Sequence, residues 1–174
     1  PADAVISEDQ ASNGSTSSTS ASGADADLTI GTSRSNPAPA GSEVLSDDMA
    51  FIITDAIRPA TDIVLQGSRD NVKPEEGREY VFVLFKVTCM KPEEEICAFN
   101  PFISVSLIGS SGIKYDYQQN VLGVDLIIDS VEFYGGATVE GYVPFIISED
   151  EMTLMIIYEP LILGDPFYLT VPET

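Results

Sequence analysis

Acidic side chains are the groups in this sequence with the clearest capacity for chemistry. They occur in short runs at Asp47–Asp48, Glu75–Glu76, Glu93–Glu95 and Glu149–Glu151. Two carboxylates act as general acid and base only when they share one concave site and have different pKa values, which spacing along the chain does not show. We expect solvated acidic loops and no resident cofactor. Because calcium takes oxygen ligands, calcium binding at Glu93–Glu95 or Ser148–Glu151 is the alternative.

Histidine is absent from the chain. This removes Ser-His-Asp and Cys-His nucleophilic sites, and zinc sites with a histidine ligand. A hydrolase that uses an acidic pair is the catalytic class that remains. We therefore expect a protein that is not an enzyme, and we assign no catalytic and no metal-binding residue.

The charge balance is strongly acidic, with 28 acidic and 8 basic residues and a formal net charge of −20. Such a surface repels phosphate backbones and anionic lipids, so nucleic acid is excluded as a partner. All Lys and Arg residues lie at or before Lys114. This uneven distribution of charge would let the acidic C-terminal part of one copy bind the basic region of a neighbouring copy. The alternative is an acidic exterior that keeps the protein soluble.

Two cysteines, Cys89 and Cys97, flank a segment that contains a proline and three glutamates, as a hairpin loop would. A disulfide forms there if the two Cα atoms come within roughly 4.4–6.8 Å. Two buried free thiols in a reducing compartment are the alternative. We expect the disulfide, because the composition of the N-terminal segment points to an extracellular or cell-surface location.

The composition changes sharply near residue 42. Residues 1–42 consist mostly of Ser, Thr, Ala and Gly, and such a segment cannot bury enough apolar area to fold alone. Within it, Ala26–Gly31 alternates like a short strand that contains Leu28, Thr29 and Ile30. We therefore divide the chain into a low-complexity segment, 1–42, and a folded domain, 43–174. The segment suits a flexible tether that carries glycans on Ser and Thr.

The chain contains no apolar stretch of the roughly 20 residues that a membrane span requires. It begins with Pro1, and its start has neither the basic residues nor the apolar stretch of a secretory signal. We expect a mature chain from which such a signal has been removed.

Residues 43–174 have the pattern of an all-β domain, with apolar β-prone runs separated by turn residues. The expected strands are Met49–Ala56, Glu79–Thr88, Phe102–Ile108, Ile113–Tyr117, Thr138–Ile147, Thr153–Tyr158 and Pro166–Val171, with short additions at Val44–Leu45 and Ile63–Leu65. The best helical candidate is a short turn within Gln118–Asp125. The pattern predicts an immunoglobulin-like antiparallel β-sandwich preceded by an extended Ser/Ala/Gly-rich segment.

Some predicted strands are apolar on both faces, most clearly Val81–Phe85 and Leu154–Ile157. A strand of a two-sheet sandwich normally buries one face. Either loops of the same chain or another subunit must cover the outer face.

Two segments resemble a known group of domains. Pro74–Val83 resembles the opening of the telokin-like, immunoglobulin-fold bacterial secreted domains of unknown function, which are related to a mycobacterial immunoprotective extracellular antigen. Gly135–Asp150 is similar to their later signature, a glycine turn followed by a strand with a Gly-Tyr step and an acidic loop. The resemblance covers 43–171. It implies a secreted β-sandwich and supplies no catalytic residue.

These observations together predict a non-catalytic secreted structural protein, a subunit of a cell-surface or extracellular assembly. In this hypothesis Leu28, Thr29 and Ile30 pair as an added strand with an adjacent copy, giving a self-associating homopolymer that extends into a filament. The alternative is a surface-tethered binding module for a ligand, glycan or partner protein. A pocket with convergent polar groups favours binding, and broad apolar surfaces favour assembly.

Overall fold

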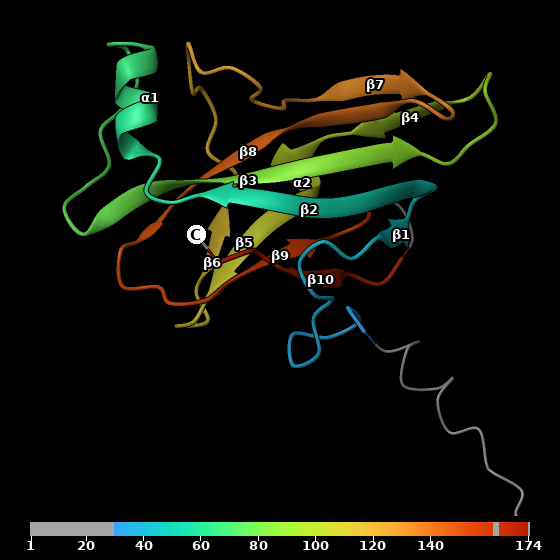
Figure 1. Cartoon of the computed structure of the whole chain (residues 1–174), viewed down its shortest axis with the longest axis horizontal. Coiled ribbons are helices and arrows are strands. Elements are labelled where there is room, and N and C mark those ends of the chain that lie inside the picture. Colours follow the sequence, from blue (N-terminus) through green and yellow to red (C-terminus); the bar gives the residue numbers. More distant parts are fainter. Residues whose placement is uncertain (1–29, 162–163, 174) are drawn as a thin grey trace, which may run out of the picture.

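The described chain is an antiparallel β-sandwich, as the sequence predicts (Figure 1). A computed structural model describes residues 30–161 and 164–173. The first sheet has the strand order β1-β2-β3-β8 and the second has the order β10-β9-β5-β6. A short pair, β4-β7, forms a third sheet.

The strands are β1 (Val44–Ser46), β2 (Met49–Ile57), β3 (Arg78–Cys89), β4 (Ile96–Phe99), β5 (Val105–Gly109), β6 (Lys114–Asp116), β7 (Val131–Tyr134), β8 (Thr138–Ser148), β9 (Leu154–Tyr158) and β10 (Phe167–Thr170). The helices are α1 (Thr61–Gly67) and α2 (Pro101–Ser104). In the described ranges, no helix has the length and hydropathy needed to cross a membrane.

The main core lies between the two large sheets. Alternate residues of β3, among them Val83 and Phe85, face it and are fully or almost fully buried because successive side chains of a strand point to opposite faces. The Phe51 ring of β2 meets the rings of Tyr158 and Phe167 in the second sheet, with centroids 4.4 and 5.9 Å apart. These aromatic contacts join the two sheets.

A second, smaller core explains why β3 is apolar on both faces. Tyr80 and Phe82 point away from the main core and are buried against Ala60 and Val64. The helix α1 supplies Val64, and residues 121–127 pack beside it. The same chain therefore covers this part of the outer face.

Part of the N-terminal segment lies on the edge of the second sheet. Ala38 forms a parallel bridge with Leu169 of β10 and is only 2% exposed. Its backbone N–H donates to Tyr168 at 2.8 Å, and Thr170 N–H donates to its carbonyl oxygen at 2.8 Å. This segment therefore extends the sheet of its own chain.

Two of the predicted elements are wrong, and a third is confirmed only in its second half. Ile63–Leu65 belongs to α1 rather than to a strand, because Val64 is needed in the smaller core. The first residues of the predicted strand Phe102–Ile108 form α2, which begins at Pro101, a residue favoured in the first helical turn. Gln118–Asp125 is not helical, because Asn71 binds the backbone N–H and carbonyl oxygen of Leu122 there.

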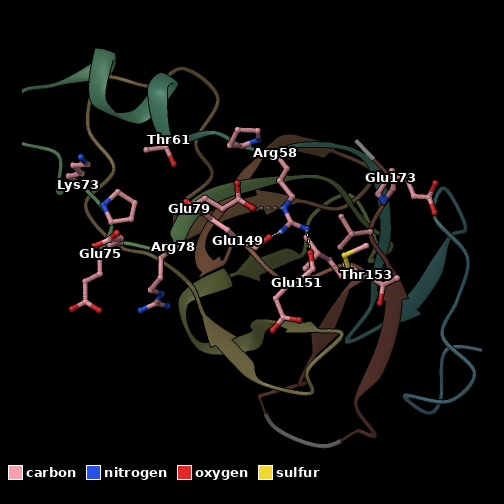
Figure 2. A pocket seen from close by; sticks show the side chains of 18 of the residues that line it. Arg58, Thr61, Lys73, Glu75, Arg78, Glu79, Glu149, Glu151, Thr153 and Glu173 are labelled. Atoms are coloured by element: carbon pink, nitrogen blue, oxygen red, sulfur yellow. Dashed lines mark hydrogen bonds and ion pairs between the residues drawn. The ribbon is translucent and has the colours of Figure 1, made fainter.

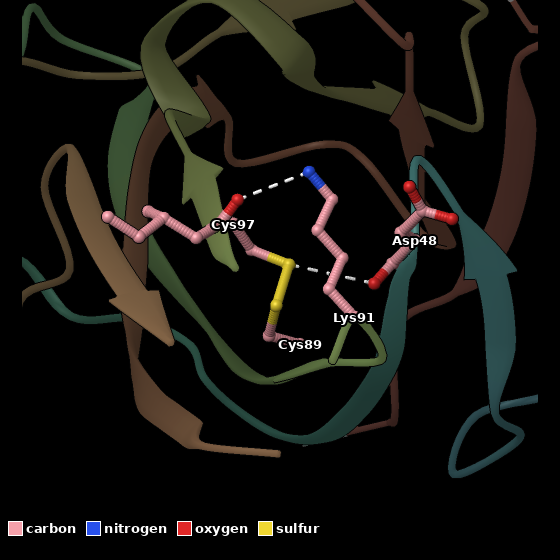
Figure 3. Close-up of a disulfide and its surroundings, with 5 residues drawn as sticks. Asp48, Cys89, Lys91 and Cys97 are labelled. Carbon is pink, nitrogen blue, oxygen red and sulfur yellow. Dashed lines mark hydrogen bonds between the residues drawn. A yellow bond between two sulfur atoms is a disulfide. The ribbon is translucent and has the colours of Figure 1, made fainter. Parts of the chain in front are cut away.

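The disulfide joins Cys89 at the end of β3 to Cys97 in β4, with the Cα atoms 5.7 Å apart (Figure 3). Both residues are buried. Cys97 Sγ lies 3.6 Å from the Asp48 carbonyl oxygen. The Lys91 ammonium donates to the Ile96 carbonyl oxygen at 3.1 Å, which links the two ends of the intervening loop.

Replacing both cysteines with alanine is expected to lower the free energy of unfolding by about 2–3 kcal/mol, because the bond closes a short loop in the unfolded chain. Urea denaturation of the whole chain measures this, with reduced wild-type protein as the control. A thiol reagent should label no cysteine before reduction. Stoichiometric labelling of the unreduced protein contradicts the pairing.

Candidate functional site

An open groove of about 1300 Å³ lies at one end of the sandwich (Figure 2). Its lining comes from four segments, within 58–61, 73–79, 149–154 and 170–173. These are the end of β2 and start of α1, the approach to β3, the β8–β9 loop and the end of β10. The groove therefore lies where both large sheets end.

The groove combines an apolar surface with charged walls. Its apolar surface is formed mainly by Pro59, Met152, Leu154, Val171 and Pro172. Met152 is 83% exposed although it is a large apolar residue. Charged side chains also line the groove. The exposed charged residues are Lys73, Glu75, Glu76, Arg78, Glu149 and Glu173.

The Arg58 guanidinium lies against the wall of this groove and binds three acceptors. Its Nε forms an ion pair with Glu79 Oε1 at 2.5 Å, and both side chains are largely buried. Its Nη1 donates to the Glu151 carbonyl oxygen at 2.5 Å, and its Nη2 donates to the Glu149 carbonyl oxygen at 3.1 Å. Arg58 therefore fastens the β8–β9 loop to the first sheet.

The Glu151 side chain lies on the other side of that loop and binds the β5–β6 hairpin. Its carboxylate accepts hydrogen bonds from the Ser110 hydroxyl and the Ser111 backbone N–H, both at 2.9 Å, and from the Ser111 hydroxyl. The Tyr115 hydroxyl donates to it at 2.8 Å. A side chain at Gly109 would collide with this carboxylate. The hairpin sequence thus forms a fitted site for one carboxylate.

These contacts determine the protonation of Glu151. Its burial raises the pKa of the carboxyl group, but the hydrogen bonds from Ser111, Tyr115 and Ser110 outweigh burial and lower the pKa to about 2. For Tyr115, burial and the bond to Glu151 raise the pKa of the hydroxyl. At neutral pH the pair is therefore a carboxylate and a neutral phenol.

This chemistry corrects one prediction from the sequence. Glu151 was expected in a solvated acidic loop or among calcium ligands, yet it is 3% exposed and its oxygens are occupied by protein donors. A carboxylate with so low a pKa is also a weak general base at neutral pH. Glu151 therefore has a structural role beside the groove. Within the described residues, no group of three or more His, Cys, Asp or Glu side chains converges on a metal position.

Of the residues predicted from the sequence, the described ones, Cys89, Cys97 and Ile30, do not line this groove. Cys89 is at the opposite end of β3 from the groove. Of the predicted donor residues, Leu28 and Thr29 lie outside the described residues, and Ile30 is 40% exposed. Sequence reasoning missed Arg58, and it considered Glu151 only as part of an acidic run. A sequence signal for the role of Glu151 is the Ser-Ser turn between Gly109 and Gly112, which offers hydroxyl donors.

No protein-family model and no curated protein matches the sequence. The fold is similar to that of the yjhA protein of Bacillus subtilis, with a TM-score of 0.55 and 11% identity over 77% of this chain and 98% of that chain. It is also similar to ycdA of Bacillus subtilis, which is proposed to be a lipoprotein, with a TM-score of 0.55 and 12% identity over 76% of this chain and 38% of that chain. A secreted protein of Mycobacterium tuberculosis, MPT63, has a TM-score of 0.47 and 17% identity over 76% of this chain and 93% of that chain.

These structural neighbours are bacterial proteins and include a secreted mycobacterial one. None of the three is described as an enzyme. At such low identities the likeness shows the fold alone.

Replacing Glu151 with glutamine is expected to lower the free energy of unfolding at pH 7 by about 2–3 kcal/mol, because hydrogen bonds to a buried charge are lost. The folded pKa lies below the ordinary value of 4.5. The stabilising effect of the carboxylate is therefore complete above pH 4.5 and is lost as the pH falls toward 2. Urea denaturation between pH 7 and pH 2 should show the difference between wild type and Glu151→Gln shrinking in that window.

Glu149→Gln is the matched control, since this side chain is exposed in the same loop. It should change stability little at any pH. Equal effects of the two substitutions at pH 7 contradict the role assigned to Glu151.

Proposed function

We propose that this chain is a non-catalytic extracellular binding module that holds an extended peptide segment of a partner protein in the groove beside Arg58. The observation that carries the proposal is the groove itself, which joins apolar residues, among them the exposed Pro59 and Met152, to exposed charges of both signs. Ligand sites commonly have this composition, with apolar contact area and a few polar groups that fix orientation.

Rigid walls support this function. Arg58 fastens the β8–β9 loop to Glu79 of β3, and Glu151 fastens the same loop to the β5–β6 hairpin. A site that is formed before the ligand arrives loses less conformational entropy on binding. The β8–β9 loop therefore holds Met152 in position at the groove before a ligand binds.

The lining favours a peptide over a glycan. None of the described residues that line the groove is aromatic, so the groove offers no flat ring on which a sugar can stack. Lys73 and Arg78 on one side can bind backbone carbonyl oxygens or acidic side chains, and Glu75 and Glu173 can bind basic ones. An extended peptide presents groups of both kinds.

The disulfide supports an extracellular or cell-surface location, because such bonds persist in oxidising compartments. Residues 1–29 have the Ser-, Ala- and Gly-rich composition of a flexible spacer. In this proposal they tether the sandwich to the cell envelope. The motifs Pro74–Val83 and Gly135–Asp150 further support kinship with the telokin-like bacterial secreted domains.

Assembly through an added strand is the second proposal. It keeps the hypothesis that Leu28, Thr29 and Ile30 pair with a second copy. The pairing of Ala38 with β10 favours strand addition as a mode of contact for this segment. The same pairing occupies the β10 edge within the chain, so a donor from a neighbour must use another edge.

Peptides selected from a random phage-displayed library on the whole chain should bind in the groove. Met152→Glu is expected to weaken their affinity by about tenfold or more, because the apolar contact of an exposed side chain is lost. Met90→Glu is the matched control, since Met90 is also exposed but lies beyond the far end of β3. Fluorescence anisotropy with the selected peptides measures both effects.

The proposal fails if no peptide is enriched, or if every enriched peptide binds wild type, Met152→Glu and Met90→Glu equally. Because Met152 is so exposed, the substitution should leave the melting temperature unchanged, and that measurement separates lost binding from lost folding.

Sedimentation of the whole chain and of a chain that begins at Ile30 tests the assembly proposal. The shorter chain keeps the pairing of Ala38 with β10, so its fold is expected to be unchanged. A tethered module gives monomers in both cases. Polymers of the whole chain that disappear in the shorter chain favour assembly instead.

A further inference from the structure

A leucine is held at the surface in a backbone conformation that leucine disfavours. Leu126 has φ of 61° and is 65% exposed. The left-handed region suits Gly, which has no Cβ to crowd the following carbonyl oxygen, or Asn, whose short polar side chain can hydrogen-bond locally. Neither packing nor backbone preference explains leucine here, which points to a contact outside the chain.

The loop that carries Leu126 is fixed at both ends. Tyr142 N–H of β8 donates to the Leu126 carbonyl oxygen at 2.7 Å, and Ile128 N–H donates to Tyr142 at 2.9 Å. The buried Asn71 amide donates to the Leu122 carbonyl oxygen at 2.8 Å, and Leu122 N–H donates to Asn71 Oδ1 at 2.8 Å. Both leucine side chains are thus presented on a backbone that is already ordered.

The loop and α1 pack closely enough to form one surface. Side chains at Gly67 and Gly123 would collide with the backbone of the opposite segment, so the two glycines permit this approach. Between the segments lies a cavity of about 460 Å³. Its apolar lining comes from Ile57, Ile63, Phe82, Val124, Leu126 and Tyr142.

One acidic side chain lines this cavity, and two more lie on the face of the first sheet that carries Tyr142. Asp125 lines it directly. Leu84 of β3 pairs with Asp55 of β2 on one side and with Tyr142 of β8 on the other. Residues that pair directly across strands lie on the same face of a sheet, so all three lie on one face of the first sheet. Glu140 lies two residues from Tyr142 on that face, opposite Lys86, which offsets one of these charges. Burial, Asp55 and Glu140 raise the pKa of the Tyr142 hydroxyl.

We propose that the surface formed by Ile63, Leu122, Leu126 and this cavity is a second docking site, which binds a cationic protein segment that inserts one aliphatic side chain. Ile63, which lines the cavity, and Leu122, next to the lining residue Gly123, are 40% and 47% exposed, so both are accessible to a bound segment. The acidic rim matches basic residues that flank the inserted one. The rim and the net charge of −20 disfavour a second copy of this chain as the occupant.

The test uses the whole ¹⁵N-labelled chain and two synthetic peptides, Lys-Lys-Leu-Lys-Lys and Lys-Lys-Ser-Lys-Lys, both capped at their ends. The leucine peptide is expected to bind about tenfold more tightly than the serine peptide, because it buries an aliphatic side chain. Its amide shift changes should centre on residues 57–67 and 122–142. Leu126→Asn should weaken binding of the leucine peptide by about tenfold without lowering the melting temperature, since asparagine tolerates a positive φ.

Leu45→Asn is the matched control, because Leu45 is 64% exposed on β1, and it should not change peptide affinity. Equal affinities for the two peptides mean that charge alone attracts them, which overturns the proposal. So do shift changes centred on the groove beside Arg58. If Leu126→Asn lowers the melting temperature by more than Leu45→Asn does, Leu126 serves the fold. If Leu126→Asn converts a dimer into monomers in sedimentation measurements, the occupant of the site is a second copy of this chain.

Discussion

The Arg58 guanidinium binds three acceptors, the Glu79 carboxylate and two backbone carbonyl oxygens. The end of the sandwich depends on these three contacts. Glu79 belongs to the first sheet, and the two carbonyl oxygens that Arg58 binds belong to the β8–β9 loop, which crosses to the second sheet. From the same loop, the Glu151 carboxylate reaches the β5–β6 hairpin of the second sheet. One loop is therefore bound to both sheets, and these contacts set the distance between the walls of the groove.

Burying these charges is favourable only because each finds partners. An unpaired buried charge costs several kcal/mol, and a fully hydrogen-bonded one costs far less. This condition ties distant segments together, since the donors to Glu151 come from a hairpin about forty residues earlier in the sequence.

On the outer face of the first sheet, the requirement is to cover apolar side chains instead of pairing buried charges. There Tyr80 and Phe82 require a cover, and the cover that α1 and residues 121–127 provide also presents Leu126.

Local patterns were enough to predict the sandwich and the disulfide. Apolar, β-prone runs bounded by turn residues mark β3 and β8, and the Pro- and Glu-containing loop between Cys89 and Cys97 marks the bond. The four-residue strands β4 and β7 were missed because so short a run carries little periodicity. Ile63–Leu65 was misassigned because its β-branched residues favour a strand, whereas the buried position of Val64 requires α1. The candidate site could not be predicted, because Arg58 and Glu151 gain their roles only from contacts across the fold.

A double-mutant cycle with Arg58→Lys and Glu151→Gln tests the central claim most directly. Lysine keeps a positive charge near Glu79 but cannot bind all three acceptors, and the two altered side chains meet only through the loop. The free energies of unfolding of wild type, both single variants and the double variant give their coupling. If the loop joins the two sheets as described, the coupling energy is about 1 kcal/mol or more. Additivity to within about 0.3 kcal/mol contradicts the account.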